Sequence, residues 1–203
     1  LNLARHDGSL DAALAAARAR GVKHFLCVSV ELDKFDLLRG IAEAHDDVSF
    51  SVGVHPCHTD AGEPALDDLL ALAAHPRIEA IKDCGGNTAK TQALIADGRL
   101  QVLTGEDAQI FHTLALGGAG AISACAHWQT PRFVELMALL RLGDLPAARH
   151  LWQALQPWVE ACFAEPNPAP LKAMLAHAGW MRSELRAPMM PASEALQDRL
   201  KAL

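Results

Sequence analysis

The stretch IEAIKDCGGNTAKTQALIADGRLQVLT, residues 78–104, decides the expected fold. Residues 78–82 and 100–104 are short apolar runs typical of strands, and residues 88–97 between them have helical periodicity. A strand, a helix and a second strand joined by short loops form a right-handed crossover, which makes the two strands parallel. The stretch therefore predicts one βα unit of a parallel sheet.

The same alternation continues on both sides of this stretch. The expected strands are residues 22–30, 48–54, 78–82, 100–104 and 119–124. The expected helices are residues 10–20, 32–45, 66–74, 88–97 and 108–116, followed after residue 131 by helices alone at 132–141, 145–163, 169–179 and 192–203. A closed (β/α)₈ barrel needs eight strands. We therefore expect an α/β fold, a partial TIM-barrel-derived parallel sheet of five or six strands with a C-terminal helical segment.

Two further expectations concern how this sheet is covered. The nearly continuous apolar run at residues 22–30 is typical of a strand buried on both faces. A sixth strand would have to precede residue 1. An open sheet also has two edges whose unpaired backbone groups favour pairing with another chain, so we expect self-association, with a homodimer as the favoured form.

The composition narrows the classes of protein. A net charge of −6 disfavours sequence-independent nucleic-acid binding, which needs a basic surface. The chain has no apolar run long enough for a membrane helix and no signal-peptide pattern, so no membrane partner is expected. Five scattered cysteines without a CxxC pair are typical of reduced thiols, which predicts a cytoplasmic location. The sequence contains no tyrosine.

The N-terminal stretches GVKHFLCVSV, SFSVGVHPCHTD and LLALAAHPRIEAI resemble the TatD-type metal-dependent deoxyribonuclease family. In that family the last stretch runs into a Gly-Glu-x-Gly-Leu-Asp-Tyr motif whose glutamate is a metal ligand, whereas residues 82–86 here read KDCGG. The resemblance leaves His55 and His58 as candidate metal ligands, and the simpler interpretation is that both are loop histidines. We therefore expect no metal site and no deoxyribonuclease activity.

The later stretches resemble dihydrodipicolinate synthase, of the N-acetylneuraminate lyase superfamily. They read IKDCGGNTAKTQALIADGRLQVLTGEDAQIFHTLALGGAGAISACAH, FAEPNPAPLKAMLAHAGW and LRAPMMPAS. The resemblance implies that Lys82 forms a Schiff base with pyruvate and that Gly105 and Ile122 match positions whose backbone lines the pyruvate pocket. Such a lysine is expected on a buried strand end, because desolvation favours the neutral, nucleophilic amine. No cofactor is implied.

Other residues allow a functional and a structural interpretation. Glu106 and Asp107 beside His127 could imitate a metal site, although a helix N-terminus with favourable acidic residues and a loop imidazole explain them more simply. Four tryptophans lie in or near the helical segment, where packing is the default interpretation and exposure would indicate a contact surface. They are Trp128, Trp152, Trp158 and Trp180.

These observations predict a recombined protein, joined near Ile81 by design or by natural fusion. Its expected parts are TatD-like βα units at residues 1–81, dihydrodipicolinate synthase-like βα units at residues 82–130, and a helical segment of the same type at residues 131–203. The proton relay and the second-substrate arginine of the synthase belong to the family's first half, so the favoured function is folding and self-association with no intact active site. The alternative is a Schiff-base lyase or aldolase that condenses pyruvate through Lys82, and a binding module that uses the tryptophan-bearing helices is a third.

Overall fold

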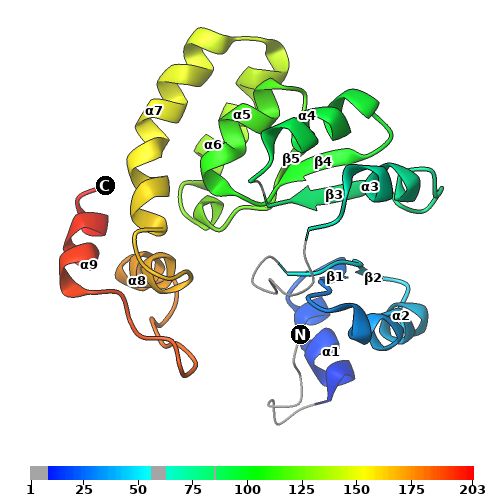
Figure 1. Ribbon diagram of the computed structural model, residues 1–203. Coiled ribbons are helices and arrows are strands. Elements are labelled where there is room, and N and C mark those ends of the chain that lie inside the picture. The colour runs from blue at the N-terminus through cyan, green and yellow to red at the C-terminus, as the bar shows by residue number, and fades with distance from the viewer. Residues whose placement is uncertain (1–8, 56–62, 85) are drawn as a thin grey trace. The chain divides into compact units, whose positions relative to one another are not determined.

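The protein divides into two units, residues 1–63 and residues 64–203. The computed structural model describes residues 9–55, 63–84 and 86–203 (Figure 1). Among these residues the protein has five strands, all paired in parallel, two in the first unit and three in the second. The parallel α/β arrangement expected from the sequence is therefore confirmed, with its strands shared between two sheets.

The first unit is a pair of parallel strands packed against two helices. Its elements are α1 (Leu10–Ala19), β1 (Phe25–Cys27), the 3₁₀ turn η2 (Leu32–Lys34), α2 (Phe35–Ala44) and β2 (Val48–Phe50). Phe25 pairs with Val48 in register. The buried core consists of Leu14 from α1, Leu38 from α2, and Cys27 and Val48 from the strands. This small unit therefore has a core of its own.

The prediction that residues 22–30 form one strand buried on both faces is wrong. β1 has three residues, and Leu26 at its centre is 52% exposed whereas its neighbour Cys27 is buried. Successive side chains of a strand point to opposite faces. The core packs against the face that carries Cys27, and Leu26 and Val28 are left exposed on the other side of the strand.

The second unit is built on a three-stranded parallel sheet in the order β3–β4–β5. Its first elements are α3 (Leu66–Leu72), β3 (Ala80–Asp83), α4 (Thr88–Asp97), β4 (Gln101–Thr104), the 3₁₀ turn η4 (Asp107–Gln109), α5 (Ile110–Ala115), β5 (Gly120–Ala121) and the 3₁₀ turn η5 (Cys125–His127). The bounds of α4 agree with the sequence because its caps are strong. The Asn87 side chain accepts a hydrogen bond from the backbone of Lys90, and Gly98 ends the helix with a φ of 74°.

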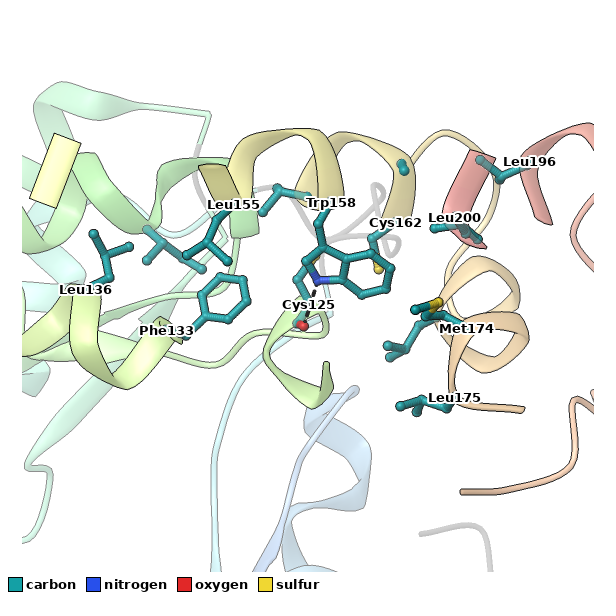
Figure 2. Packing of buried hydrophobic residues seen from close by; sticks show 14 of the residues in the cluster. Cys125, Phe133, Leu136, Leu155, Trp158, Cys162, Met174, Leu175, Leu196 and Leu200 are labelled. Atoms are coloured by element: carbon teal, nitrogen blue, oxygen red, sulfur yellow. Dashed lines mark hydrogen bonds between the residues drawn. The ribbon is translucent and has the colours of Figure 1, made fainter. Parts of the chain in front are cut away.

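The C-terminal helical segment is confirmed. It consists of α6 (Thr130–Leu142), α7 (Leu145–Cys162), α8 (Ala169–His177) and α9 (Glu194–Lys201), and Figure 1 shows α7 running from the sheet region toward α8 and α9. Its core includes Leu136, Leu155, Trp158 and Leu200 (Figure 2). No described helix is long and apolar enough to cross a membrane.

The tryptophans divide between packing and exposure. Trp158 is 1% exposed, and its indole N–H donates to the Cys125 carbonyl oxygen at 3.0 Å. Trp152 packs against Phe111. Trp180 is largely exposed, and its ring centroid lies 5.2 Å from that of Trp128. Packing therefore accounts for Trp158 and Trp152, as the default interpretation has it, and Trp180 is the exposed exception.

Glu165, in the turn between α7 and α8, joins that turn to the start of α9. Its carboxylate accepts hydrogen bonds from the Ser193 hydroxyl at 2.5 Å and from the Ser193 backbone N–H at 2.9 Å. The Ser193 hydroxyl also caps α9 by accepting from the Leu196 backbone. The hydrogen bonds from Ser193 lower the pKa of Glu165 below its usual value.

We predict that Glu165→Gln destabilises the protein near neutral pH and that this effect disappears in acid. Because the folded state lowers the pKa of Glu165, its contribution is complete above the unfolded value, about 4.3, and is lost as the pH falls through the folded value. Urea unfolding from pH 7 to pH 3 measures the difference between the two proteins. Glu135→Gln, on exposed α6 surface, is the matched control. A difference that stays constant with pH would contradict the prediction.

Candidate functional site

The two faces of the β3–β4–β5 sheet have different surroundings. Ile81 and Val102 are paired in register and pack with Leu69 of α3 and Leu94 of α4, so their face is covered by helices. Lys82 pairs with Leu103, one residue further along each strand, and therefore lies on the opposite face. Leu103 pairs in turn with Gly120 of β5. Lys82 thus stands on the face away from α3 and α4.

Lys82 is exposed, which corrects the expectation of a buried lysine. The exposure of Lys82 means that the described residues do not supply the desolvation of a buried strand end, and α3 and α4 pack on the other face. The position of Lys82 on the sheet is nevertheless the one that the resemblance implies, next to the C-terminal end of a parallel strand. In (β/α) folds the reactive groups gather at that end of the strands.

Gly105 leaves the space that the Lys82 side chain occupies. A methyl group built on Gly105 would overlap Lys82 Cε and would lie 2.8 Å from Cys84 Sγ and 3.0 Å from Lys82 Cγ. The Gly105 backbone N–H donates to the Asp83 carbonyl oxygen at 2.7 Å, which continues the pairing of β3 with β4. A side chain at residue 105 and the present position of Lys82 therefore exclude each other.

Ile122 continues the same arrangement on the third strand. Its backbone N–H donates to the Thr104 carbonyl oxygen at 2.8 Å, and its side chain is 45% exposed. The structure thus brings Lys82, Gly105 and Ile122 to the C-terminal ends of three neighbouring strands. Their roles remain predictions.

Asp107 is a residue whose role the sequence interpretation missed. It is 2% exposed, and its carboxylate accepts hydrogen bonds from the Ser123 hydroxyl, from the Cys125 N–H at 2.8 Å and from the Ala124 N–H at 3.4 Å. The structural interpretation of this pair is confirmed, since Glu106 is the N-cap residue of η4 and Asp107 is the acidic residue in its first turn. The partners of Asp107 lie 16 to 18 residues away, so no local pattern could have revealed them.

A small polar cavity lies on the helix-covered face behind the strand ends. It is bounded by Asp83, Thr91, Thr104 and Thr113, and its volume of about 20 Å³ is enough for one water molecule. The Thr91 hydroxyl donates to the Asp83 carboxylate there at 2.5 Å. The larger cavity, about 200 Å³, lies between α8 and α9 and contains none of the predicted site residues. Neither cavity is a substrate pocket around Lys82.

The candidate metal ligands are not brought together among the described residues. The His55 backbone N–H donates to the Val30 carbonyl oxygen, and His58 lies outside the described part of the chain. His127 contacts the Ala124 carbonyl oxygen through Nδ1 at 3.0 Å. Within residues 9–55, 63–84 and 86–203, no three His, Cys, Asp or Glu side chains form a group that could hold a metal ion.

The second unit thus has a parallel βα sheet with its chemically distinctive residues at the C-terminal strand ends, an arrangement found in (β/α) barrel proteins. The family model of the dihydrodipicolinate synthetase family matches residues 60–203, and the chain belongs to that family. The model of the TatD related DNase family matches residues 1–95. Both resemblances inferred from the sequence are therefore confirmed, and the two matches overlap between residues 60 and 95.

Individual relatives agree with this placement. The 4-hydroxy-tetrahydrodipicolinate synthase 2 of Clostridium acetobutylicum is 38% identical over 137 residues, which are 66% of this chain and 48% of that protein. The corresponding synthase of Sorangium cellulosum is 41% identical over 133 residues, 63% of this chain and 43% of that protein. The chain therefore spans about half the length of the curated relatives it matches.

Solved structures of dihydrodipicolinate synthases resemble this protein in fold as well. The crystal structure of the chloride-inhibited dihydrodipicolinate synthase from Acinetobacter baumannii complexed with pyruvate matches with a TM-score of 0.69 and 26% identity. The match covers 93% of this chain and 67% of that one. The chain thus shares the fold of these synthases over most of its own length.

We predict that Gly105→Ala destabilises the protein by about 1 kcal/mol, because an overfilled site usually costs 1–3 kcal/mol and the flexible Lys82 side chain can partly move away. Lys82→Ala in the same chain should relieve part of this cost, since it removes the two Lys82 atoms that the new methyl group meets and leaves the contact with Cys84 Sγ. Urea unfolding of the two single variants and the double variant measures the coupling. Gly53→Ala, where a methyl group meets nothing within 4 Å, is the control. Additive costs would show that the two residues do not compete for space.

Proposed function

We propose that Lys82 forms a Schiff base with a small 2-keto acid, pyruvate being the first candidate. The observation that carries this proposal is the placement of the Lys82 side chain against Gly105 at the end of the neighbouring strand, with Ile122 at the end of the strand after that. Membership of the dihydrodipicolinate synthetase family and the pyruvate complex of a related structure support the choice of substrate.

The proposed step is a condensation that needs no metal or redox cofactor. The neutral amine of Lys82 attacks the keto carbon, and a carbon–nitrogen double bond forms as the keto oxygen leaves with the two amine protons as water. The exposed position of Lys82 lets solvent supply and remove the protons of the intermediate steps. The exposed amine is, in turn, expected to react more slowly than a desolvated one.

The proposal covers capture of the keto acid and not a complete aldol turnover. The resemblance to the synthase family implies a proton relay that uses tyrosines of the family's first half. These 203 residues contain no tyrosine and span about half the length of the curated relatives, so they do not supply that relay. Loss of a general acid–base relay typically lowers a rate about 10²–10⁴-fold. We therefore expect a Schiff-base site without synthase turnover.

A recombined origin is part of this proposal. It joins TatD-like units at residues 1–81 to synthase-like βα units at residues 82–130 and the helical segment at residues 131–203. The successive matches to two family models support such a junction, which would lie near Ile81 within β3. Both parent families place a strand there, so the junction preserves which side chains face the helices. Whether the joining was natural or engineered does not alter the site.

The first test is chemical trapping. Borohydride in the presence of pyruvate should reduce the Schiff base to a stable amine on Lys82, which peptide mass spectrometry locates. Lys82→Arg keeps the charge but cannot condense, so its labelling should be lost. Lys23→Arg, at an exposed lysine of the first unit, should leave labelling unchanged. Labelling that is absent, or that is spread equally over exposed lysines, would contradict the proposal.

Self-association is the second candidate function, favoured by the uncovered sheet faces. In the first unit Leu26, Val28 and Val52 are all more than half exposed, and in the second unit Ile122 and Lys82 are exposed. Contiguous exposed apolar side chains commonly mark an interaction surface. The outer edges of β1–β2 and of β3–β5 are not paired with a further strand among the described residues. We infer that two copies of the chain cover these surfaces in a homodimer.

Light scattering tests the oligomeric state. The native chain, of 21.7 kDa, should give the mass of two copies at micromolar concentration. Leu26→Lys places a charge on the exposed face of β1 and should shift the protein toward monomers. Leu37→Lys adds the same charge at an exposed residue of α2 and should not. A native monomer at every concentration would contradict the inference.

A further inference from the structure

The backbone of Cys125 is hydrogen-bonded by buried side chains at both its N–H and its carbonyl oxygen. Its N–H donates to Oδ1 of Asp107 at 2.8 Å, and its carbonyl oxygen accepts from Nε1 of Trp158 at 3.0 Å. Figure 2 shows the second bond as a dashed line from the indole on α7 to the Cys125 oxygen. Cys125, Asp107 and Trp158 are each at most 2% exposed. Three segments far apart in sequence therefore meet at the backbone of one residue, Cys125.

The residues held in this way follow directly after the candidate site. Asp107 accepts hydrogen bonds from the Ser123 hydroxyl and from the Ala124 and Cys125 backbones, and Ile122 is the residue before them. The Ile122 N–H is itself bonded to Thr104, the residue before Gly105. The position of the Ile122 backbone relative to Lys82 thus depends on how residues 123–125 are held.

The strength of this arrangement comes from burial and charge. Hydrogen bonds to an ionised carboxylate are shorter and about twice as strong as neutral ones. A buried indole N–H can act only as a hydrogen-bond donor. Leaving this N–H or the Cys125 carbonyl oxygen unpaired in the interior would lower the stability of the fold. The hydrogen bonds of Asp107 and Trp158 therefore hold residues 123–125 in one position.

We propose that Asp107 and Trp158 are positioning residues for the keto-acid site, and that α7 thereby acts as a support for the strand end that carries Ile122. The inference rests on the proposed Schiff-base function of Lys82. It adds that the C-terminal helical segment, which contributes no group to the reaction, determines how well the keto acid binds. Neither residue touches the reacting atoms in this proposal.

A purely structural role and a positioning role make different predictions. Loss of a structural contact lowers stability and lowers the fraction of folded protein, which changes the maximal labelling and not the keto-acid concentration that half-saturates it. Loss of a positioning contact displaces the Ile122 backbone in folded protein and raises the half-saturating concentration. Measuring the maximal labelling and the half-saturating keto-acid concentration separately therefore distinguishes the two roles.

The experiment measures the rate of Lys82 labelling by borohydride against pyruvate concentration in the native chain, Asp107→Asn, Trp158→Phe and the double variant. Asp107→Asn should raise the half-saturating concentration about tenfold, as expected for weakened hydrogen bonds to a charged group, and change the maximal rate less than about twofold. Trp158→Phe keeps an aromatic ring but removes the indole N–H, and it should raise the half-saturating pyruvate concentration about threefold. The double variant should fall short of the product of the two effects, because both side chains hold the backbone of the same residue, Cys125.

Matched controls come from the same residue types. Asp97→Asn removes an exposed carboxylate bonded to Arg99, and Trp152→Phe removes an indole from the same helix as Trp158. Both should leave the half-saturating concentration unchanged. Should Asp107→Asn fail to fold, Ser123→Ala removes one of its donors and should raise the half-saturating concentration about twofold to threefold.

The outcomes are distinguishable. A native chain that is not labelled overturns the proposed function and this inference with it. A labelled native chain whose variants keep the native half-saturating concentration, or whose double variant shows the full product of the single effects, overturns the inference alone.

Discussion

A parallel strand has two faces, and both need cover when both carry apolar side chains. In this protein α1 and α2 pack on the face of the first sheet that carries Cys27 and Val48, and α3 and α4 pack on the face of the second sheet that carries Ile81 and Val102. The opposite faces carry Leu26 and Lys82, which are exposed. The accessibility of the candidate nucleophile and the surfaces open to a second chain both follow from this one-sided packing.

The same constraint sets the surroundings of the candidate site. Register places Lys82, Gly105 and Ile122 at adjacent strand ends, because parallel strands bring their C-terminal ends to one edge. A closed ring of strands would surround such a lysine with side chains, whereas a three-stranded sheet cannot. Family membership by itself therefore does not establish the reactivity of Lys82, which has to be argued from the surroundings of its side chain.

The second unit is held together by a small number of buried polar contacts as well as by its apolar core. Asp107 binds the segment after β5, and Trp158 binds the same segment from α7. The core around Leu136 and Leu155 surrounds these contacts with apolar side chains, which excludes water and strengthens them (Figure 2). The sheet edge and the helical segment consequently behave as one body at this point.

Local signals in the sequence determined the helices, their order and the parallel βα class of the fold. The bounds of α4 agree with the sequence because Asn87 and Gly98 cap it, and Lys82, Gly105 and Ile122 could be named because each lies in a recognisable motif. Only the tertiary structure decided the lengths of the strands, their division into two sheets, the exposure of Leu26 and Lys82, and the role of Asp107. The physical reason is that helix caps act over a few residues of chain, whereas burial and strand pairing depend on groups that are distant in sequence and meet only when the chain has folded.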